Sequence, residues 1–221
     1  MAGFQVAIDG PAGSGKSTIS KLIADQLNMT HIDTGAMYRA VTLLAIEKNI
    51  DLNVESNYDF LESIEISYHD DHIYIDQRNV ESEIRSKAVT NNVSLVSSFP
   101  YVRKKMVELQ KKAALKGDII MDGRDIGTVV IPDAQLKIFL VADVHERAKR
   151  RQKEKEKIGH QVELQKLVEE IALRDQKDST RKESPLKKAW DAIEIDTTNL
   201  TIEQTVKKII GLIETAKGVK K

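Results

Sequence analysis

Gly10-Pro-Ala-Gly-Ser-Gly-Lys-Ser-Thr18 is the stretch that decides the fold of this 221-residue chain. It matches the pattern G-x-x-x-x-G-K-[ST] of a phosphate-binding P-loop, with Gly10 and residues 15–17 at the defining positions. An apolar run at residues 4–8 comes before it, and apolar residues recur at helical spacing over residues 19–27. The motif therefore lies between a buried strand and a helix, the setting in which a P-loop binds nucleotide phosphates.

The residue types in this loop suit phosphate binding. Glycines let the backbone curl so that several N–H groups face phosphate oxygens, and the helix that follows adds the positive end of its dipole. The lysine of such a loop reaches the β- and γ-phosphates, and Ser17 is placed to ligate Mg²⁺. The residues predicted to bind the nucleotide are Gly10, Pro11, Ala12, Gly13, Ser14, Gly15, Lys16, Ser17 and Thr18.

The composition narrows the class of protein. Lys plus Arg and Asp plus Glu both number 34, so the formal net charge is zero, which argues against a large nucleic-acid surface. The chain has no Cys, which excludes disulfides, thiol nucleophiles and thiolate metal sites. No signal peptide is visible, and no apolar run approaches the about 18 residues that a membrane helix needs. We expect a cytoplasmic monomer that binds neither nucleic acid nor membrane.

Strand and helix patterns alternate along the chain, which predicts an α/β fold with a mostly parallel sheet covered on both faces. Residues 64–68 and 72–76 alternate apolar and polar around Asp70-Asp71, and they predict a small antiparallel hairpin. Core strands are expected over residues 4–8, 119–121, 136–141 and 193–195. Helices are expected over residues 35–50, 82–98, 101–116, 145–157 and 163–178, and from a capping box at Thr201 and Gln204 onward.

A P-loop alone does not separate a small-molecule kinase from a GTPase or an ATPase. The chain has no Asn-Lys-x-Asp, which a guanine-reading GTPase would carry, and no Asp-Glu pair to end a Walker B strand. Cations around the transferred phosphoryl group stabilise its transition state, and arginines recur in the segments expected near the site. These are Arg39, Arg124, Arg147, Arg150, Arg151, Arg174 and Arg181. The pattern favours a kinase.

Four stretches resemble the bacterial cytidylate kinases, and the similarity runs nearly end to end. They are Gly10–Thr18, Asp33–Arg39, Asp122–Pro132 and Arg174–Arg181, of which Asp122-Gly-Arg-Asp-Ile-Gly-Thr128 is the most specific. The resemblance implies a P-loop NTPase-type three-layer fold and transfer of the γ-phosphoryl group of ATP to CMP or dCMP with Mg²⁺. It also implies one kinase domain over residues 1–221. Its parts would be a core (1–59, 83–152 and 163–221), a monophosphate-binding insert (about 60–82) and a mobile lid (about 153–162).

The same resemblance implies roles for individual side chains. The cytosine pocket would be lined by Thr34, Ser94, Arg103 and Asp125. The acceptor phosphate would be held by Arg39, Arg124 and Arg181, and the sugar by Arg174 and Asp178. The groups acting on the transferred phosphoryl group would be Lys16, Arg124 and a lid arginine, Arg150 or Arg151.

The chemistry of cytosine agrees with this assignment. Its N4 amino group donates a hydrogen bond, which the carboxylate of Asp125 can accept, while Arg103 or a hydroxyl can donate to N3 or O2. Uracil reverses the first two groups and would leave polar side chains unpaired, so we expect UMP to be rejected relative to CMP.

Several alternatives remain open from the residues. Asp122 could bind a Mg²⁺-coordinated water or order the P-loop. The acceptor could be AMP or UMP. The chain could also be an ATPase or a nucleotide-controlled binding module, and the basic stretch Arg147–Lys157 could bind RNA.

Overall fold

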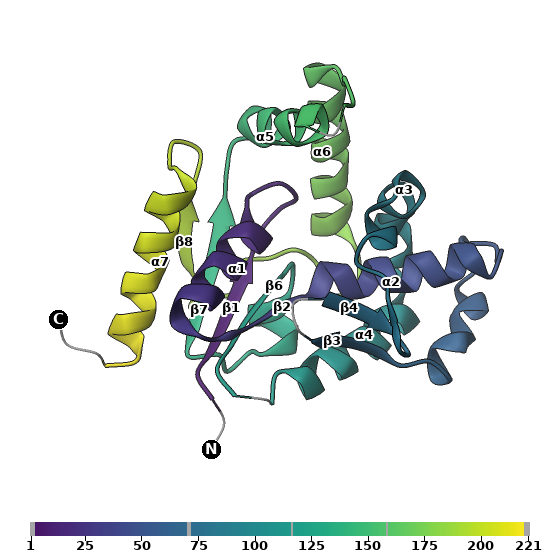
Figure 1. Ribbon diagram of the computed structural model, residues 1–221, viewed down its shortest axis with the longest axis horizontal. Helices are drawn as coiled ribbons and strands as arrows, with labels where there is room; N and C mark the ends of the chain where they lie inside the picture. Colours follow the sequence, from purple (N-terminus) through teal and green to yellow (C-terminus); the bar gives the residue numbers. More distant parts are fainter. Residues whose placement is uncertain (1–2, 70–71, 116, 158, 219–221) are drawn as a thin grey trace.

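The computed structural model describes residues 3–69, 72–115, 117–157 and 159–218, and it has the predicted α/β architecture (Figure 1). Its main sheet has five strands, all parallel. In order across the sheet they are β2 (Thr30–Asp33), β6 (Ile119–Gly123), β1 (Gln5–Asp9), β7 (Leu136–Val141) and β8 (Ile193–Asp196). The P-loop therefore leaves the carboxyl end of the central strand, where ligands bind in open α/β sheets.

Helices cover both faces of this sheet (Figure 1). Helices α1 (Lys16–Leu27) and α7 (Ile202–Ala216) pack against Val6 and Ile8 of β1. Ala7, which points to the opposite face, packs in the core that includes Val107 of α4 (Pro100–Ala113). Successive strand side chains face opposite sides, so the middle of β1, residues 6–8, is a continuous apolar run because both of its faces are covered.

The predicted hairpin is confirmed and gains a short third strand. The antiparallel sheet consists of β3 (Ile66–His69), β4 (His72–Ile75) and β5 (Arg78–Asn79), and Asp70-Asp71 lie outside the described residues. Its apolar face joins a second core with α2 (Thr34–Glu47), the 3₁₀ segment η1 (Glu55–Glu62) and α3 (Lys87–Val96). This insert and the main sheet are built on separate cores.

Some predicted boundaries were wrong. The helix expected over 82–98 is a 3₁₀ turn, η2 (Glu83–Arg85), followed by α3. The break occurs because Ser86 adopts an extended conformation and its hydroxyl caps α3 by accepting from the Val89 N–H. Helix α2 ends at Glu47 rather than at Ile50. Strand β2 was not predicted, since its sequence Thr-His-Ile-Asp is mostly polar.

Helices α5 (Val144–Lys157) and α6 (Leu164–Thr180) form the upper part of the molecule in Figure 1. They pack together through Ala148, Leu167 and Ile171. The predicted lid, about 153–162, consists of the last turn of α5 and the loop that follows it, and residue 158 of that loop lies outside the described residues. Among the described helices, none has both the length and the apolar character needed to cross a membrane.

Candidate functional site

The P-loop forms the floor of the site between β1 and α1. Gly13 and Gly15 have φ values of 75° and 89°, a backbone region that side chains with a Cβ disfavour. No side chain caps α1, so its first N–H groups face the loop. The loop therefore presents backbone donors to an anion at the carboxyl edge of the sheet.

Lys16 is buried inside this loop. Its Nζ donates to the Pro11 carbonyl oxygen at 2.8 Å and lies 3.4 Å from Ser14 Oγ. Burial, together with the positive charge of Arg124, lowers the pKa of Lys16 to about 7, while Asp122 and Asp9 oppose the shift. The buried ammonium has lost its contacts with water. Phosphate oxygens bound in the loop would take the place of those waters.

Ser17 is joined to two side chains from neighbouring strands. Its Oγ donates to Asp122 Oδ2 at 2.8 Å, and Asp122 Oδ1 lies 2.7 Å from His31 Nε2. Asp122 and His31 are both buried. Asp33, which caps α2 through its bond from the Ala36 N–H, lies close by, and burial together with the charge of Asp122 raises the pKa of Asp33.

These oxygen donors fit Mg²⁺. A hydroxyl and carboxylates are hard ligands, and Mg²⁺ usually keeps several waters and binds through one or two protein groups plus substrate phosphates. Within the described residues, no three His, Cys, Asp or Glu side chains cluster as a metal site. Ser17 and the carboxylate of Asp122 are the groups here that fit such an ion.

Asp125, a predicted acceptor-binding residue, is the centre of a buried polar cluster. Its Oδ2 accepts from Arg103 Nη2 at 2.5 Å, and its Oδ1 lies 3.7 Å from Arg181 Nη2, beyond hydrogen-bond distance. Arg103 also donates to the Ser97 carbonyl at 3.1 Å and stacks over the ring of Tyr38, 5.2 Å from its centroid. The side chains of Arg103, Asp125 and Arg181 are at most 7% exposed.

A second ion-pair cluster joins Arg124, the residue after β6, to α6. Arg124 Nε donates to Asp178 Oδ2 at 2.9 Å. Burial raises the pKa of Asp178, but Arg124 and Arg174 outweigh burial and hold that pKa below its usual range. Burial lowers the pKa of Arg174 to about 10, helped by the neighbouring charge of Arg124. Positive charge is therefore concentrated here beyond what Asp178 neutralises.

The remaining predicted acceptor residues lie on α2 and α3. Arg39 Nη1 donates to Thr90 Oγ1 at 3.0 Å, and burial lowers the pKa of Arg39 to about 10. Thr34 is buried, and its hydroxyl donates to the Asp122 carbonyl at 2.7 Å. Ser94 Oγ is buried and has no hydrogen-bond partner among the described residues.

The arginines of α5 have different surroundings. Arg147 Nη1 donates to the Ala12 carbonyl of the P-loop and to Asp175 of α6, which joins α5 to both. Arg150 donates through both terminal nitrogens to Thr197 at the end of β8. Arg151 is 40% exposed, its Nη1 lies 3.5 Å from Glu154 Oε2, and its charge contributes to lowering the pKa of Arg39 and of Arg174.

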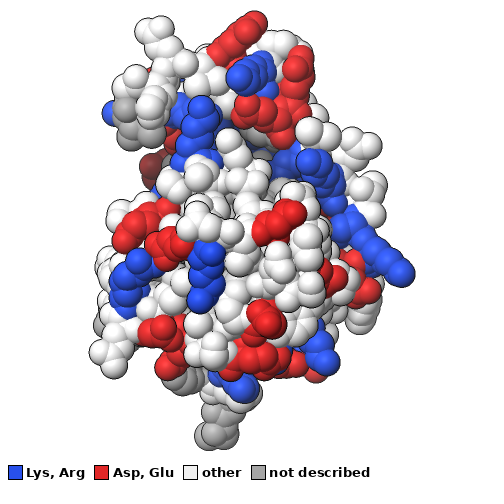
Figure 2. Space-filling model, turned by 90° about the vertical axis from the view of Figure 1, so that its right-hand side faces the viewer, with Lys and Arg blue, Asp and Glu red and all other residues white. Residues whose placement is uncertain are grey.

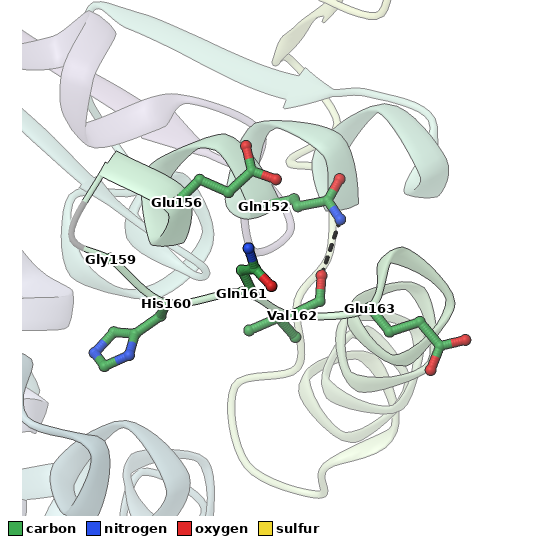
Figure 3. Close-up of a pocket in the computed structure, with 7 residues that line it drawn as sticks. All are labelled: Gln152, Glu156, Gly159, His160, Gln161, Val162 and Glu163. Carbon is green, nitrogen blue, oxygen red and sulfur yellow. Dashed lines mark hydrogen bonds between the residues drawn. The ribbon is translucent and has the colours of Figure 1, made fainter.

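Basic side chains also gather on the surface of the molecule. Figure 2 shows Lys and Arg side chains around the constriction beneath the upper part of the molecule, the part that α5 and α6 form in Figure 1. A separate cavity lies between Gln152 and Glu156 of α5 and the loop at 159–163 (Figure 3). Gln152 Nε2 donates across it to the Val162 carbonyl at 2.9 Å. None of the predicted site residues lines this cavity.

Residues 6–215 match the family model described as cytidylate kinase. The chain belongs to the cytidylate kinase family. It is 70% identical to the cytidylate kinase of Acholeplasma laidlawii (strain PG-8A) over 99% of both chains. It is 53% identical to that of Clostridium tetani (strain Massachusetts / E88) over 95% of this chain and 93% of the other. As a cytidylate kinase it transfers the γ-phosphoryl group of ATP to CMP or dCMP.

Solved structures agree on the fold. An uncharacterized protein from Eubacterium ventriosum ATCC 27560 superimposes with a TM-score of 0.54, over 96% of this chain and 98% of the other. The two sequences are 13% identical, so this likeness concerns the fold alone.

Two residues of this cytidylate kinase site were missed from the sequence. His31 belongs to β2, which was not predicted, and it contacts Asp122 across the parallel β2–β6 pair. Asp9 was not among the predicted site residues, although a carboxylate at the carboxyl end of the central strand lies where ligands bind. Its place at the end of the predicted central strand could have identified Asp9 from the sequence. No feature of the sequence pointed to His31.

Proposed function

We propose that this cytidylate kinase recognises CMP or dCMP through Asp125, Arg103 and the side chains around them. The observation that supports this most is a set of buried polar atoms without hydrogen-bond partners among the described residues: Ser94 Oγ, Arg103 Nε, Arg174 Nε and Arg181 Nη2. Buried polar groups are normally paired in folded proteins, so a group of unpaired ones around two ion-pair clusters fits a polar ligand.

The proposed reading of cytosine uses the free capacity of these groups. Asp125 Oδ1 lies 3.7 Å from Arg181 Nη2, so this oxygen can still accept from the N4 amino group. Arg103 can donate to N3 or O2, and Thr34 and Ser94 supply the hydroxyls of the pocket. Uracil would bring its O4 against the carboxylate and leave both sides unpaired, which disfavours UMP.

The proposed transfer is direct and needs no covalent enzyme intermediate. The acceptor phosphate has a second pKa near 6 and is mostly dianionic at pH 7, so no base must activate it. The main barrier is repulsion between two anions. Arg39, Arg124 and Arg181 would hold the acceptor phosphate, Lys16 would hold the donor phosphates, and Arg174 with Asp178 would contact the sugar.

We propose that Ser17 holds Mg²⁺ together with the phosphates of ATP, and that Asp122 orders Ser17 through the 2.8 Å hydrogen bond. The ion supplies charge neutralisation on the donor phosphates when bound.

Replacing Ser17 with Ala should raise the Mg²⁺ concentration needed for half-maximal rate by about tenfold, because the hydroxyl ligand and its hydrogen bond to Asp122 are both lost. The measurement is a Mg²⁺ titration of the rate at fixed ATP. Ser20→Ala is the control, since Ser20 is buried one turn along the same helix and its Oγ has no hydrogen-bond partner among the described residues. Equal Mg²⁺ curves for both variants would contradict the role of Ser17.

Of Arg150 and Arg151 on α5, we propose that Arg151 contacts the phosphates. Arg150 is already bound to Thr197, whereas Arg151 is partly exposed and close enough to Arg39 and Arg174 to affect their pKa values. Arg151→Ala should lower kcat by roughly tenfold to a hundredfold, since a cation that acts in the transition state is removed.

Arg150→Ala provides the comparison for this prediction. It should chiefly lower the melting temperature, because its hydrogen bonds to Thr197 hold α5 to the end of β8. A larger fall in kcat for Arg150→Ala than for Arg151→Ala would reverse the assignment.

A panel of acceptors tests the proposal as a whole. ADP release from Mg·ATP would be measured with CMP, dCMP, UMP, AMP and GMP, and without acceptor. Fast release with CMP and dCMP alone supports the proposed pocket. Faster release with another monophosphate, or without any acceptor, contradicts it.

Donor and acceptor groups both come from one chain, so we propose that the monomer is active, and that it works in the cytoplasm, where ATP is plentiful.

A further inference from the structure

Asp9 connects the two halves of the site through its side chain. It is the last residue of β1, directly before Gly10 of the P-loop, and it is 4% exposed. Its Oδ1 accepts from the Ile126 N–H and its Oδ2 from the Gly127 N–H, both at 2.8 Å. Each carboxylate oxygen thus holds one backbone donor of a distant segment.

That segment is η3 (Ile126–Val130), a π-helical turn that directly follows Arg124 and Asp125. Asp125 occupies its capping position with φ −142° and ψ 24°, but its side chain makes no capping hydrogen bond. A helical turn needs partners for its first N–H groups, and here Asp9 supplies them from another strand. The carboxylate of Asp125 is therefore available to Arg103 and Arg181.

The turn is also confined from its other side. Gly127 lies against the buried stem of Lys137, because a Cβ built on Gly127 would come within 3.1 Å of Lys137 Cδ. Lys137 Nζ is in turn held by Asp191 at 2.8 Å. A turn packed this closely has little freedom once Asp9 holds its first N–H groups.

We propose that Asp9 is a positioning residue that fixes the acceptor-binding residues Arg124 and Asp125 relative to the P-loop, and thereby sets the approach of acceptor to donor phosphate. The proposal rests on the acceptor roles assigned above to Arg124 and Asp125. Asp9 touches neither substrate itself, and it acts through the backbone of η3.

The Asp9 carboxylate lies in a buried environment that disfavours its charge. Burial raises the pKa of Asp9 to about 6, although the N–H groups of Gly127 and Ile126 lower it. The charged groups that face it are Asp125, which raises the pKa, and Lys16, which lowers it. Protonation would put a hydroxyl against an N–H donor, so η3 should be held less firmly below about pH 6.

The test compares Asp9→Asn and Asp9→Ala with the wild-type enzyme. Asn keeps one acceptor oxygen and Ala keeps none, so kcat/KM for CMP should fall in the order wild type, Asn, Ala, by about tenfold or more in Ala. The Kd of ATP, measured by titration without CMP, should stay near the wild-type value. A role in stability alone would lower the melting temperature and leave the KM for CMP of the folded fraction unchanged.

Asp118→Asn is the matched control. Asp118 Oδ1 accepts from the Phe4 N–H at 2.7 Å, so it is also a carboxylate that joins β1 to the β6 segment, but at the opposite end of the strands. It should change the melting temperature without changing kcat/KM for CMP. In the wild type, kcat/KM for CMP should fall below about pH 6 more steeply than in Asp9→Asn. The phosphate of CMP titrates with both enzymes, so the difference between the two pH profiles reports on Asp9.

The outcomes are distinguishable. If Asp9→Asn retains the wild-type kcat/KM for CMP while Asp125→Asn loses it, the role of Asp9 is overturned and the acceptor site stands. If Asp125→Asn is unaffected, the acceptor assignment fails and this inference fails with it. If Asp9→Asn weakens ATP and CMP equally, Asp9 supports the P-loop rather than the acceptor residues, and the proposal is overturned.

Discussion

Asp125→Asn is expected to lower kcat/KM for CMP by roughly a hundredfold, because truncating one partner of a buried charge pair commonly costs 2–5 kcal/mol. The amide keeps the shape of the side chain but loses its negative charge. Arg103, whose Nη2 lies 2.5 Å from Asp125, would then lose its ionic partner in a buried position. The N4 amino group of cytosine would lose its proposed acceptor at the same step.

The size of this loss should depend on the acceptor base. UMP lacks the N4 donor, so its already low kcat/KM should fall much less than that of CMP. The ratio of kcat/KM for CMP to kcat/KM for UMP should therefore become smaller. Steady-state rates with both acceptors give this ratio directly. Asp133→Asn is the control, because Asp133 is exposed a few residues further along the same segment. An equal loss with CMP and UMP would indicate a structural role for Asp125 instead.

Lys16→Met is expected to lower kcat by about a hundredfold to a thousandfold, the range seen when one preorganised donor to developing charge is removed. Met preserves most of the aliphatic stem, which is buried, and removes only the ammonium that the loop holds against Pro11. The measurement is single-turnover transfer at saturating ATP and CMP, so that weaker binding does not mask the chemical step.

Folding should survive this change. Burial lowers the pKa of Lys16 to about 7 from its ordinary value of 10.5, so the folded state disfavours its charged form, and an uncharged side chain relieves that cost. The melting temperature should therefore be unchanged or higher. Lys21→Met, on the exposed face of the same helix, should leave kcat unchanged. A wild-type kcat in Lys16→Met would contradict the proposed role of the ammonium.

Local sequence determined a large part of this protein. The P-loop was recognisable because its glycines, lysine and serine act within a few residues of one another. The strands β1, β6 and β7 were recognisable because both faces are buried, which requires continuous apolar runs. The hairpin at β3 and β4 was recognisable because one exposed face produces alternation. In each case the physical requirement lies within a short stretch of chain.

Tertiary structure decided the features that depend on partners far along the chain. The mostly polar strand β2 is held by pairing with β6, and this pairing brings His31 to Asp122. The different surroundings of Arg150 and Arg151 follow from which helix face meets Thr197, which lies 47 residues from Arg150 in the sequence. Asp9 reaches Ile126 across 117 residues. Such contacts arise from the packing of whole elements, which no local pattern encodes, whereas the phosphate-binding loop was determined by the sequence alone because its own backbone forms the site.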